Sequence, residues 1–78
     1  MSGIVHNPVQ ALPGVTVSLV NPVFGRSSPA ISDQNGYYYF TNVPVGSFYI
    51  EAYWGVRLMY RGAITFAGNP VRWDIPLP

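Results

Sequence analysis

The most constraining feature of the chain is the stretch from Asp33 to Ala52, which reads DQNGYYYFTNVPVGSFYIEA. It begins with turn-forming residues, because Asp and Asn side chains hydrogen-bond their own backbone and Gly accepts a positive φ. Two runs rich in Tyr, Phe and Ile follow, separated by a Pro/Gly connection. Aromatic and β-branched runs bounded by such residues are typical of strands. The stretch therefore predicts a tight turn, a strand, a connection and a second strand.

The rest of the chain repeats this pattern of short apolar runs between Pro and Gly residues, with no sustained helical period. We expect strands over residues 3–7, 15–20, 30–32, 37–40, 47–53, 56–66 and 71–77. Several short strands at this spacing favour an antiparallel β-sandwich. We therefore predict an all-β fold of about seven strands, in a single domain over residues 1–78.

Alternation along each strand assigns its two faces. We expect Tyr38 to point inward and its neighbours outward. Glu51 decides which face of the second aromatic strand points outward, because an unpaired carboxylate is rarely buried. Tyr49 and Tyr53 have the same parity as Glu51, so we expect them to point outward as well. The predicted core consists of Val5, Val15, Val17, Leu19, Tyr38, Phe40, Phe48, Ile50, Ala52, Ile64, Val71, Trp73 and Ile75.

Composition restricts the partners. Only 9% of the residues are charged, whereas 49% are hydrophobic, so we expect contact with another chain or a neighbouring domain. The net charge of +1 and the absence of lysine exclude the electrostatic footprint that nucleic acid requires. No apolar run reaches ~20 residues, so we expect no membrane insertion. Without cysteine no disulfide can form.

Residues that carry catalysis or bind metals are scarce. His6 is the only histidine in the sequence, and the acids Asp33, Glu51 and Asp74 lie in separate predicted elements. A metal site usually draws several ligands, and a nucleophile needs a positioned base, so we expect no enzyme activity, metal or cofactor. Residues 33–36 share the opening of a calcium loop but lack its closing glutamate on a helix, which favours turn chemistry.

Outward tyrosines are the candidate binding residues. We expect the two aromatic strands to be antiparallel neighbours in one sheet. Their outward rings then form one continuous platform, made of Tyr37, Tyr39, Tyr49 and Tyr53. Such rings suit a protein interface or the apolar face of a sugar, and they also simply stabilise sheets. Arg57 and Arg61 are expected to share one strand face with Met59. There they hold a phosphate or carboxylate, or they are simply solvated or paired with an acid such as Glu51, as exposed arginines usually are.

Four segments, over residues 2–5, 12–19, 32–40 and 43–52, carry a resemblance in their order and composition. The chain resembles the carboxypeptidase regulatory-like domain, a transthyretin-like Greek-key sandwich related to the collagen-adhesin B-type repeat. The resemblance implies a non-catalytic module of the kind attached to peptidases, receptors, adhesins and polysaccharide-binding proteins. The lysine–asparagine isopeptide bond of the adhesin branch is excluded, because the chain has no lysine.

We therefore expect a non-enzymatic module that docks on a protein partner, a fused or neighbouring domain or a second copy, through the tyrosine face or an exposed strand edge. The alternative is a carbohydrate-binding accessory domain that stacks a polysaccharide on the same tyrosines. The first residues lack the segments of a signal peptide, which predicts a cytoplasmic protein or an excised domain with an added methionine. The resemblance instead favours exported or cell-surface proteins.

Overall fold

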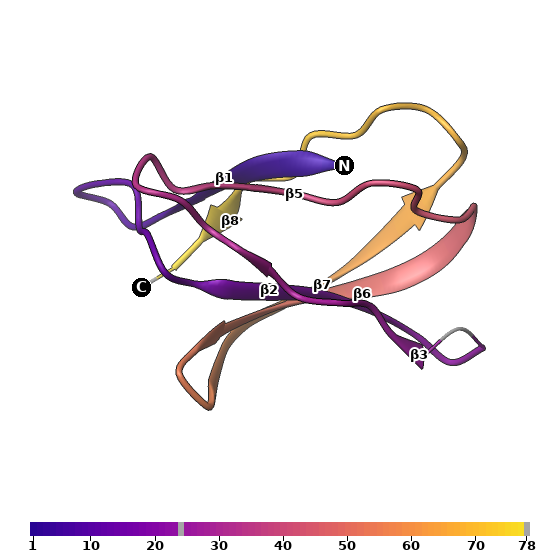
Figure 1. Cartoon of the computed structure of the whole chain (residues 1–78), viewed down its shortest axis with the longest axis horizontal. Coiled ribbons are helices and arrows are strands. Elements are labelled where there is room, and N and C mark those ends of the chain that lie inside the picture. Colours follow the sequence, from indigo (N-terminus) through magenta and orange to yellow (C-terminus); the bar gives the residue numbers. More distant parts are fainter. Residues whose placement is uncertain (24, 78) are drawn as a thin grey trace.

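The computed structural model describes residues 1–23 and 25–77, and these residues form two β-sheets packed together, with no helix (Figure 1). The strands of this part of the chain are β1 (Ser2–His6), β2 (Thr16–Asn21), β3 (Gly25–Arg26), β4 (Ala30–Ile31), β5 (Tyr37–Tyr39), β6 (Gly46–Trp54), β7 (Arg57–Phe66) and β8 (Ile75–Pro76). The expected all-β sandwich is confirmed. Gly55 and Val56 form the turn of the β6–β7 hairpin, which extends past the other strands at one end of the sandwich.

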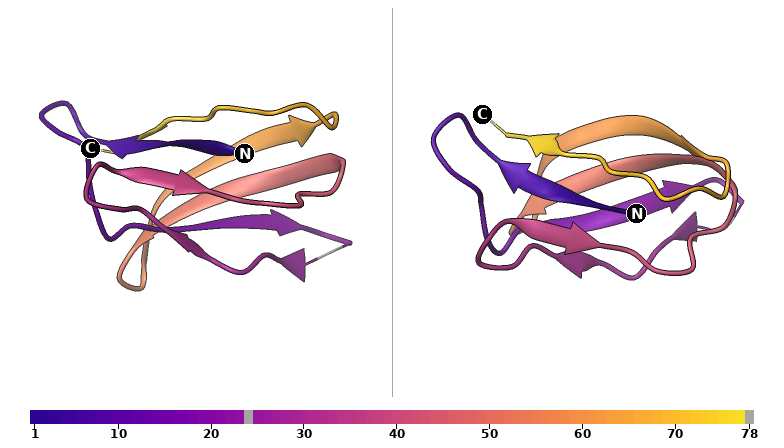
Figure 2. Two further views of the ribbon diagram at one scale, coloured as in Figure 1. Left: turned by 45° about the horizontal axis from the view of Figure 1, so that its top comes forward. Right: turned by 90° about the horizontal axis from the view of Figure 1, so that it is seen from above.

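The smaller sheet has the order β5-β1-β8, and the larger one has the order β3-β2-β6-β7, with β4 also pairing with β2. Figure 2 shows the smaller sheet lying over the larger one. The expectation of purely antiparallel pairing is wrong for one pair, because β1 and β8 run parallel, with Val5 opposite Ile75. Parallel strands need a crossover connection, and here the rest of the domain separates the two strands.

Strand alternation predicts the core well. Tyr38, Phe48 and Ile50 are buried, whereas Tyr37, Tyr39 and Tyr49 are exposed. Ten of the thirteen predicted core residues are buried, and the other three, Phe40, Val71 and Trp73, are only partly buried against them. Phe66 and Leu77 are also buried in the core, although they were not predicted. The Phe66 ring packs edge-on against Phe48, with 5.6 Å between ring centroids.

The turn at residues 33–36 is held by Asp33. Its Oδ1 accepts hydrogen bonds from the backbone N–H groups of Asn35, at 2.8 Å, and Tyr37, at 3.0 Å. Gly36 has a φ of 79° and its N–H donates to the Asp33 carbonyl. Its own carbonyl accepts from the Val5 N–H, which ties the turn to β1. These bonds account for Asp33 as a turn residue.

The smaller sheet closes around Gly3. A Cβ atom at this position would lie 1.8 Å from the Trp73 carbonyl oxygen, so no side chain fits between β1 and the segment before β8. The Ser2 N–H donates a hydrogen bond to the Val71 carbonyl at 3.0 Å, and the Trp73 N–H donates one to the Ser2 carbonyl at 2.8 Å. From β5, Tyr38 lies opposite Gly3, and its hydroxyl donates to the same Trp73 carbonyl. One glycine therefore allows three segments to meet.

Candidate functional site

The predicted tyrosine platform does not exist as one surface. β5 pairs with β1 in the smaller sheet, whereas β6 pairs with β2 and β7 in the larger sheet. Tyr37 and Tyr39 therefore lie on the outer face of one sheet, and Tyr49 and Tyr53 on the outer face of the other. The prediction fails because residues 40–45 carry the chain from one sheet to the other instead of closing a hairpin.

On the smaller sheet the two outward tyrosines are prominent. Tyr37 is 48% exposed and Tyr39 is 70% exposed. They lie opposite Ile4 and Ser2 of β1. Because residues two apart on a strand are ~6.6 Å apart along it, the two rings form a short aromatic row on this face.

The outer face of the larger sheet is organised around Glu51. This residue lies at the centre of β6, opposite Ser18 on β2 and Arg61 on β7. Its outward direction agrees with the alternation, yet it is only 7% exposed. A carboxylate on an outer sheet face is normally solvated, so its burial requires partners that replace water.

Two arginines and a tyrosine supply these partners. Glu51 Oε1 lies 2.8 Å from Arg26 Nη1 and accepts a hydrogen bond from the Tyr53 hydroxyl at 2.9 Å. Its Oε2 lies 3.5 Å from Arg61 Nε. The pairing of Arg61 with Glu51 was one of the predicted alternatives. Arg26 was not predicted, because it lies in a Pro/Gly-rich segment without a periodic pattern.

The same arginines lie over the neighbouring tyrosine rings. The guanidinium carbon of Arg61 is 4.1 Å from the centroid of Tyr49, and that of Arg26 is 5.7 Å from the centroid of Tyr53. Such cation–π contacts orient a guanidinium without consuming its hydrogen-bond donors. We name the five residues the Glu51 cluster: Arg26, Tyr49, Glu51, Tyr53 and Arg61.

Electrostatics hold the cluster ionised. Burial by itself would raise the pKa of Glu51, but the hydrogen bonds from Tyr53 and Arg26 and the charges of Arg26 and Arg61 outweigh it, so the pKa is lowered. The hydrogen bond to Glu51 likewise raises the pKa of Arg26. The cluster therefore has two positive groups around one negative group at neutral pH.

Arg57 does not join this face, so the prediction that it shares one with Arg61 is wrong. The β6–β7 register shifts at Ala52 and Tyr53, since Ala52 lies opposite Tyr60 but Tyr53 lies opposite Leu58. The extra residue of this bulge reverses the alternation of β7. Arg57, opposite Trp54, is exposed near the hairpin turn.

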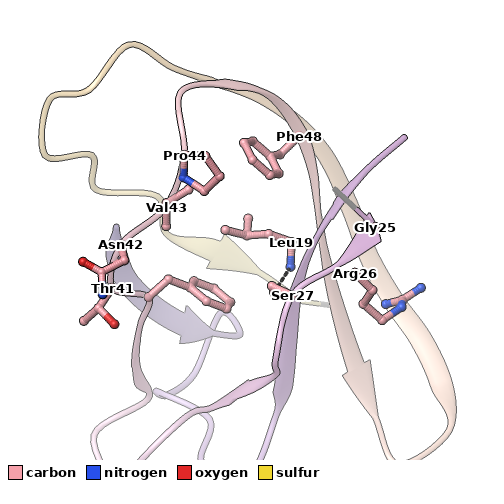
Figure 3. Close-up of a pocket in the computed structure, with 10 residues that line it drawn as sticks. Leu19, Gly25, Arg26, Ser27, Thr41, Asn42, Val43, Pro44 and Phe48 are labelled. Atoms are coloured by element: carbon pink, nitrogen blue, oxygen red, sulfur yellow. Dashed lines mark hydrogen bonds between the residues drawn. The ribbon is translucent and has the colours of Figure 1, made fainter. Parts of the chain in front are cut away.

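A separate cavity of about 190 Å³ opens between the larger sheet and residues 40–44, which connect the two sheets (Figure 3). Its apolar lining comes from Leu19, Phe40, Val43, Pro44 and Phe48. Arg26 borders the cavity, but Figure 3 shows its guanidinium directed away from the apolar side chains. The cavity therefore suits an apolar group and offers little that would orient a polar ligand.

The remaining acids and the histidine lie in other places. The Asp33 carboxylate accepts a hydrogen bond within its own turn. Asp74 accepts a hydrogen bond from the Ile4 N–H at 3.0 Å and forms an ion pair with Arg72 at 3.2 Å. Asp74 is thus on the smaller sheet, whereas Glu51 is on the larger one. His6 lies opposite Pro76 in the β1–β8 pair. The paired-carboxylate arrangement of a glycosidase would need two acids facing one cleft.

No protein-family model matches the chain, and no curated protein matches its sequence. Within residues 1–23 and 25–77, no helix has the length and apolar character needed to cross a membrane.

Proposed function

We propose that the chain is a non-enzymatic interaction module, and that the outer face of the larger sheet docks on a protein partner, a neighbouring domain or a second copy. The single observation that carries the proposal is the Glu51 cluster. Tyrosine and arginine are the residue types enriched at binding hot spots, and here they are held in place by a buried carboxylate. Ordering these side chains before binding lowers the entropy lost on association.

The strand at the edge of this sheet extends the proposed docking surface. β7, from Arg57 to Phe66, lies at the end of the strand order and pairs with β6. An edge strand presents backbone donors and acceptors to a partner strand. The exposed Leu58 lies opposite Tyr53, so an apolar side chain adjoins the cluster on the same face.

We also propose that the sandwich is transthyretin-like with Greek-key connections, as in the carboxypeptidase regulatory-like domain that the sequence resembles. The support is the two-sheet architecture together with the order of the four segments quoted above. Family members of this kind are usually non-catalytic, which agrees with the proposed docking role.

Site-specific photo-crosslinking in the source cells tests the docking face. A photo-reactive phenylalanine analogue replaces Tyr49, and the matched control replaces Tyr37 on the opposite sheet. We expect discrete adducts from position 49 that disappear when Arg61→Gln is added, and no such adducts from position 37. Sedimentation velocity from micromolar to millimolar concentration tests the second-copy version. A strict monomer that also gives no adduct from position 49 would refute the proposal.

The alternative function, binding of a polysaccharide, is supported by the aromatic row of Tyr37 and Tyr39, since exposed rings in a row can stack on successive sugars. Tyr53 no longer belongs to this alternative, because it lies on the other sheet. A glycan array decides it: hits that are lost in Tyr39→Ser but kept in Tyr49→Ser favour a sugar site, and a blank array rejects it.

A further inference from the structure

We infer that Arg26 and Arg61 form a receptor for the carboxylates of an acidic peptide segment, and that this segment is what the partner presents to the outer face of the larger sheet. The inference rests on the proposed docking function and adds the chemistry of the partner. It follows from the unused donors of the two guanidiniums, the charge of the face and the spacing of the two groups.

Each guanidinium has donors left over after it has neutralised Glu51. A guanidinium carries five N–H donors in a planar fork. The contact of Arg26 with Glu51 is made through one Nη atom, and that of Arg61 through Nε. The side chains remain 50% and 53% exposed, respectively, whereas the Glu51 side chain is 9% exposed. A partner therefore meets positive donors on this face, while the negative charge lies beneath them.

The rest of the chain does not cancel this positive character. The three acidic residues of the sequence are Asp33, Glu51 and Asp74. Asp33 belongs to the turn that bonds to β1, and Asp74 is attached to β1 of the smaller sheet through the Ile4 N–H. Among residues 1–23 and 25–77, Glu51 is thus the only acid that lies on the larger sheet. The cluster has two positive charges against one, so it is complementary to an anionic segment.

The geometry favours single carboxylates over a phosphate chain. Arg26 reaches Glu51 from β3, across β2, whereas Arg61 approaches from β7 on the other side of β6. Because Glu51 lies between the two guanidiniums, each of them offers a fork to its own anionic group. A carboxylate fits such a fork with two parallel hydrogen bonds. Tyr49 is 42% exposed, so the part of its ring that Arg61 leaves uncovered supplies apolar contact for the rest of a peptide.

A fluorescently labelled glutamate-rich peptide tests the inference, with its affinity measured by anisotropy at low and moderate salt. Glu51→Gln removes the internal carboxylate that competes for the arginines. We expect it to tighten binding by about two- to fivefold, on the scale of one exposed ion pair. Adding Arg61→Gln to Glu51→Gln should abolish the gain without leaving a buried, unpaired carboxylate.

Asp74→Asn is the matched control, because it changes the net charge by the same amount beside Arg72 on the opposite sheet. We expect it to leave the affinity nearly unchanged. An equal gain in Asp74→Asn and Glu51→Gln would reduce the effect to net charge and overturn the inference. No change or weaker binding in Glu51→Gln would overturn it as well, since the arginines would then only neutralise Glu51.

Two further outcomes separate this inference from the proposed function. Tighter binding of a sulfated oligosaccharide than of the peptide would overturn the acidic-peptide inference and favour a carbohydrate partner. Absence of peptide binding in every variant, with position-49 crosslinks intact, would overturn the inference but leave the docking face in place.

Discussion

Replacing Gly3 with alanine tests how closely the segments of the smaller sheet approach each other. The added Cβ would lie 1.8 Å from the Trp73 carbonyl oxygen and 2.9 Å from the Tyr38 hydroxyl. Neither the carbonyl carbon of Trp73, at 2.6 Å, nor its oxygen can yield without moving the backbone. The variant must therefore separate β1 from the segment that leads into β8.

This separation breaks the hydrogen bonds that meet at Gly3. They are the Ser2–Val71 and Trp73–Ser2 backbone bonds and the bond from Tyr38 to Trp73. At about 0.5–1.5 kcal/mol each, their loss lowers the free energy of unfolding by roughly 2–4 kcal/mol. At the usual stability per residue, a chain of 78 residues has a total free energy of unfolding of about 4–12 kcal/mol. The expected loss is therefore a large part of the total.

Chemical denaturation and thermal unfolding measure the effect, and we expect the Tm to fall by roughly 10–25 °C. Gly14→Ala is the control. Gly14 has a φ of 75° and no atom within 4 Å of an added Cβ, so only the backbone conformation is penalised, by about 1–2 kcal/mol. If Gly3→Ala lowers the free energy of unfolding by no more than Gly14→Ala does, the close approach of Trp73 to β1 is refuted.

Two further predictions concern buried polar groups. Tyr38→Phe should lower the free energy of unfolding by about 1 kcal/mol, because the Trp73 carbonyl loses its donor, whereas Tyr37→Phe at an exposed position should change it little in the same denaturation experiment. The lowered pKa of Glu51 means that its ionised form stabilises the fold above the unfolded pKa of about 4.3, and that this stabilisation is lost as the pH falls towards the lower folded value. The Tm difference between the wild type and Glu51→Gln should therefore be constant near neutral pH and shrink in acid; a difference that grows in acid would contradict the sign.

Local patterns could be predicted from the sequence because they depend on neighbouring residues. The alternation around Tyr38 and Phe48 identifies the buried face of each strand, and the Asp33 turn follows from its own side chain. Strand pairing is a different problem, since it depends on residues far apart in the chain. Residues 40–45 have the composition of a hairpin loop, yet they cross between sheets, so the pairing of β5 with β1 could not be read from them.

The candidate site was only partly predictable for two physical reasons. A bulge adds one residue and reverses the alternation beyond it, and this change moved Arg57 away from the face of Arg61. Arg26 lies in a strand of only two residues, which is too short for any periodic pattern. Its importance follows from the carboxylate that it reaches across β2, a contact that exists only after folding.

Folding of the larger sheet and recognition by it are linked through one carboxylate. Glu51 is buried, and two arginines and a tyrosine contact its carboxylate, so the fold itself holds these side chains in place. Side chains ordered in advance lose less entropy when a partner binds. The same contacts also set the limit on affinity, since Glu51 competes with an incoming carboxylate for the guanidiniums. Glu51→Gln should consequently separate the two roles: it should lower the free energy of unfolding at neutral pH and tighten the binding of an acidic peptide.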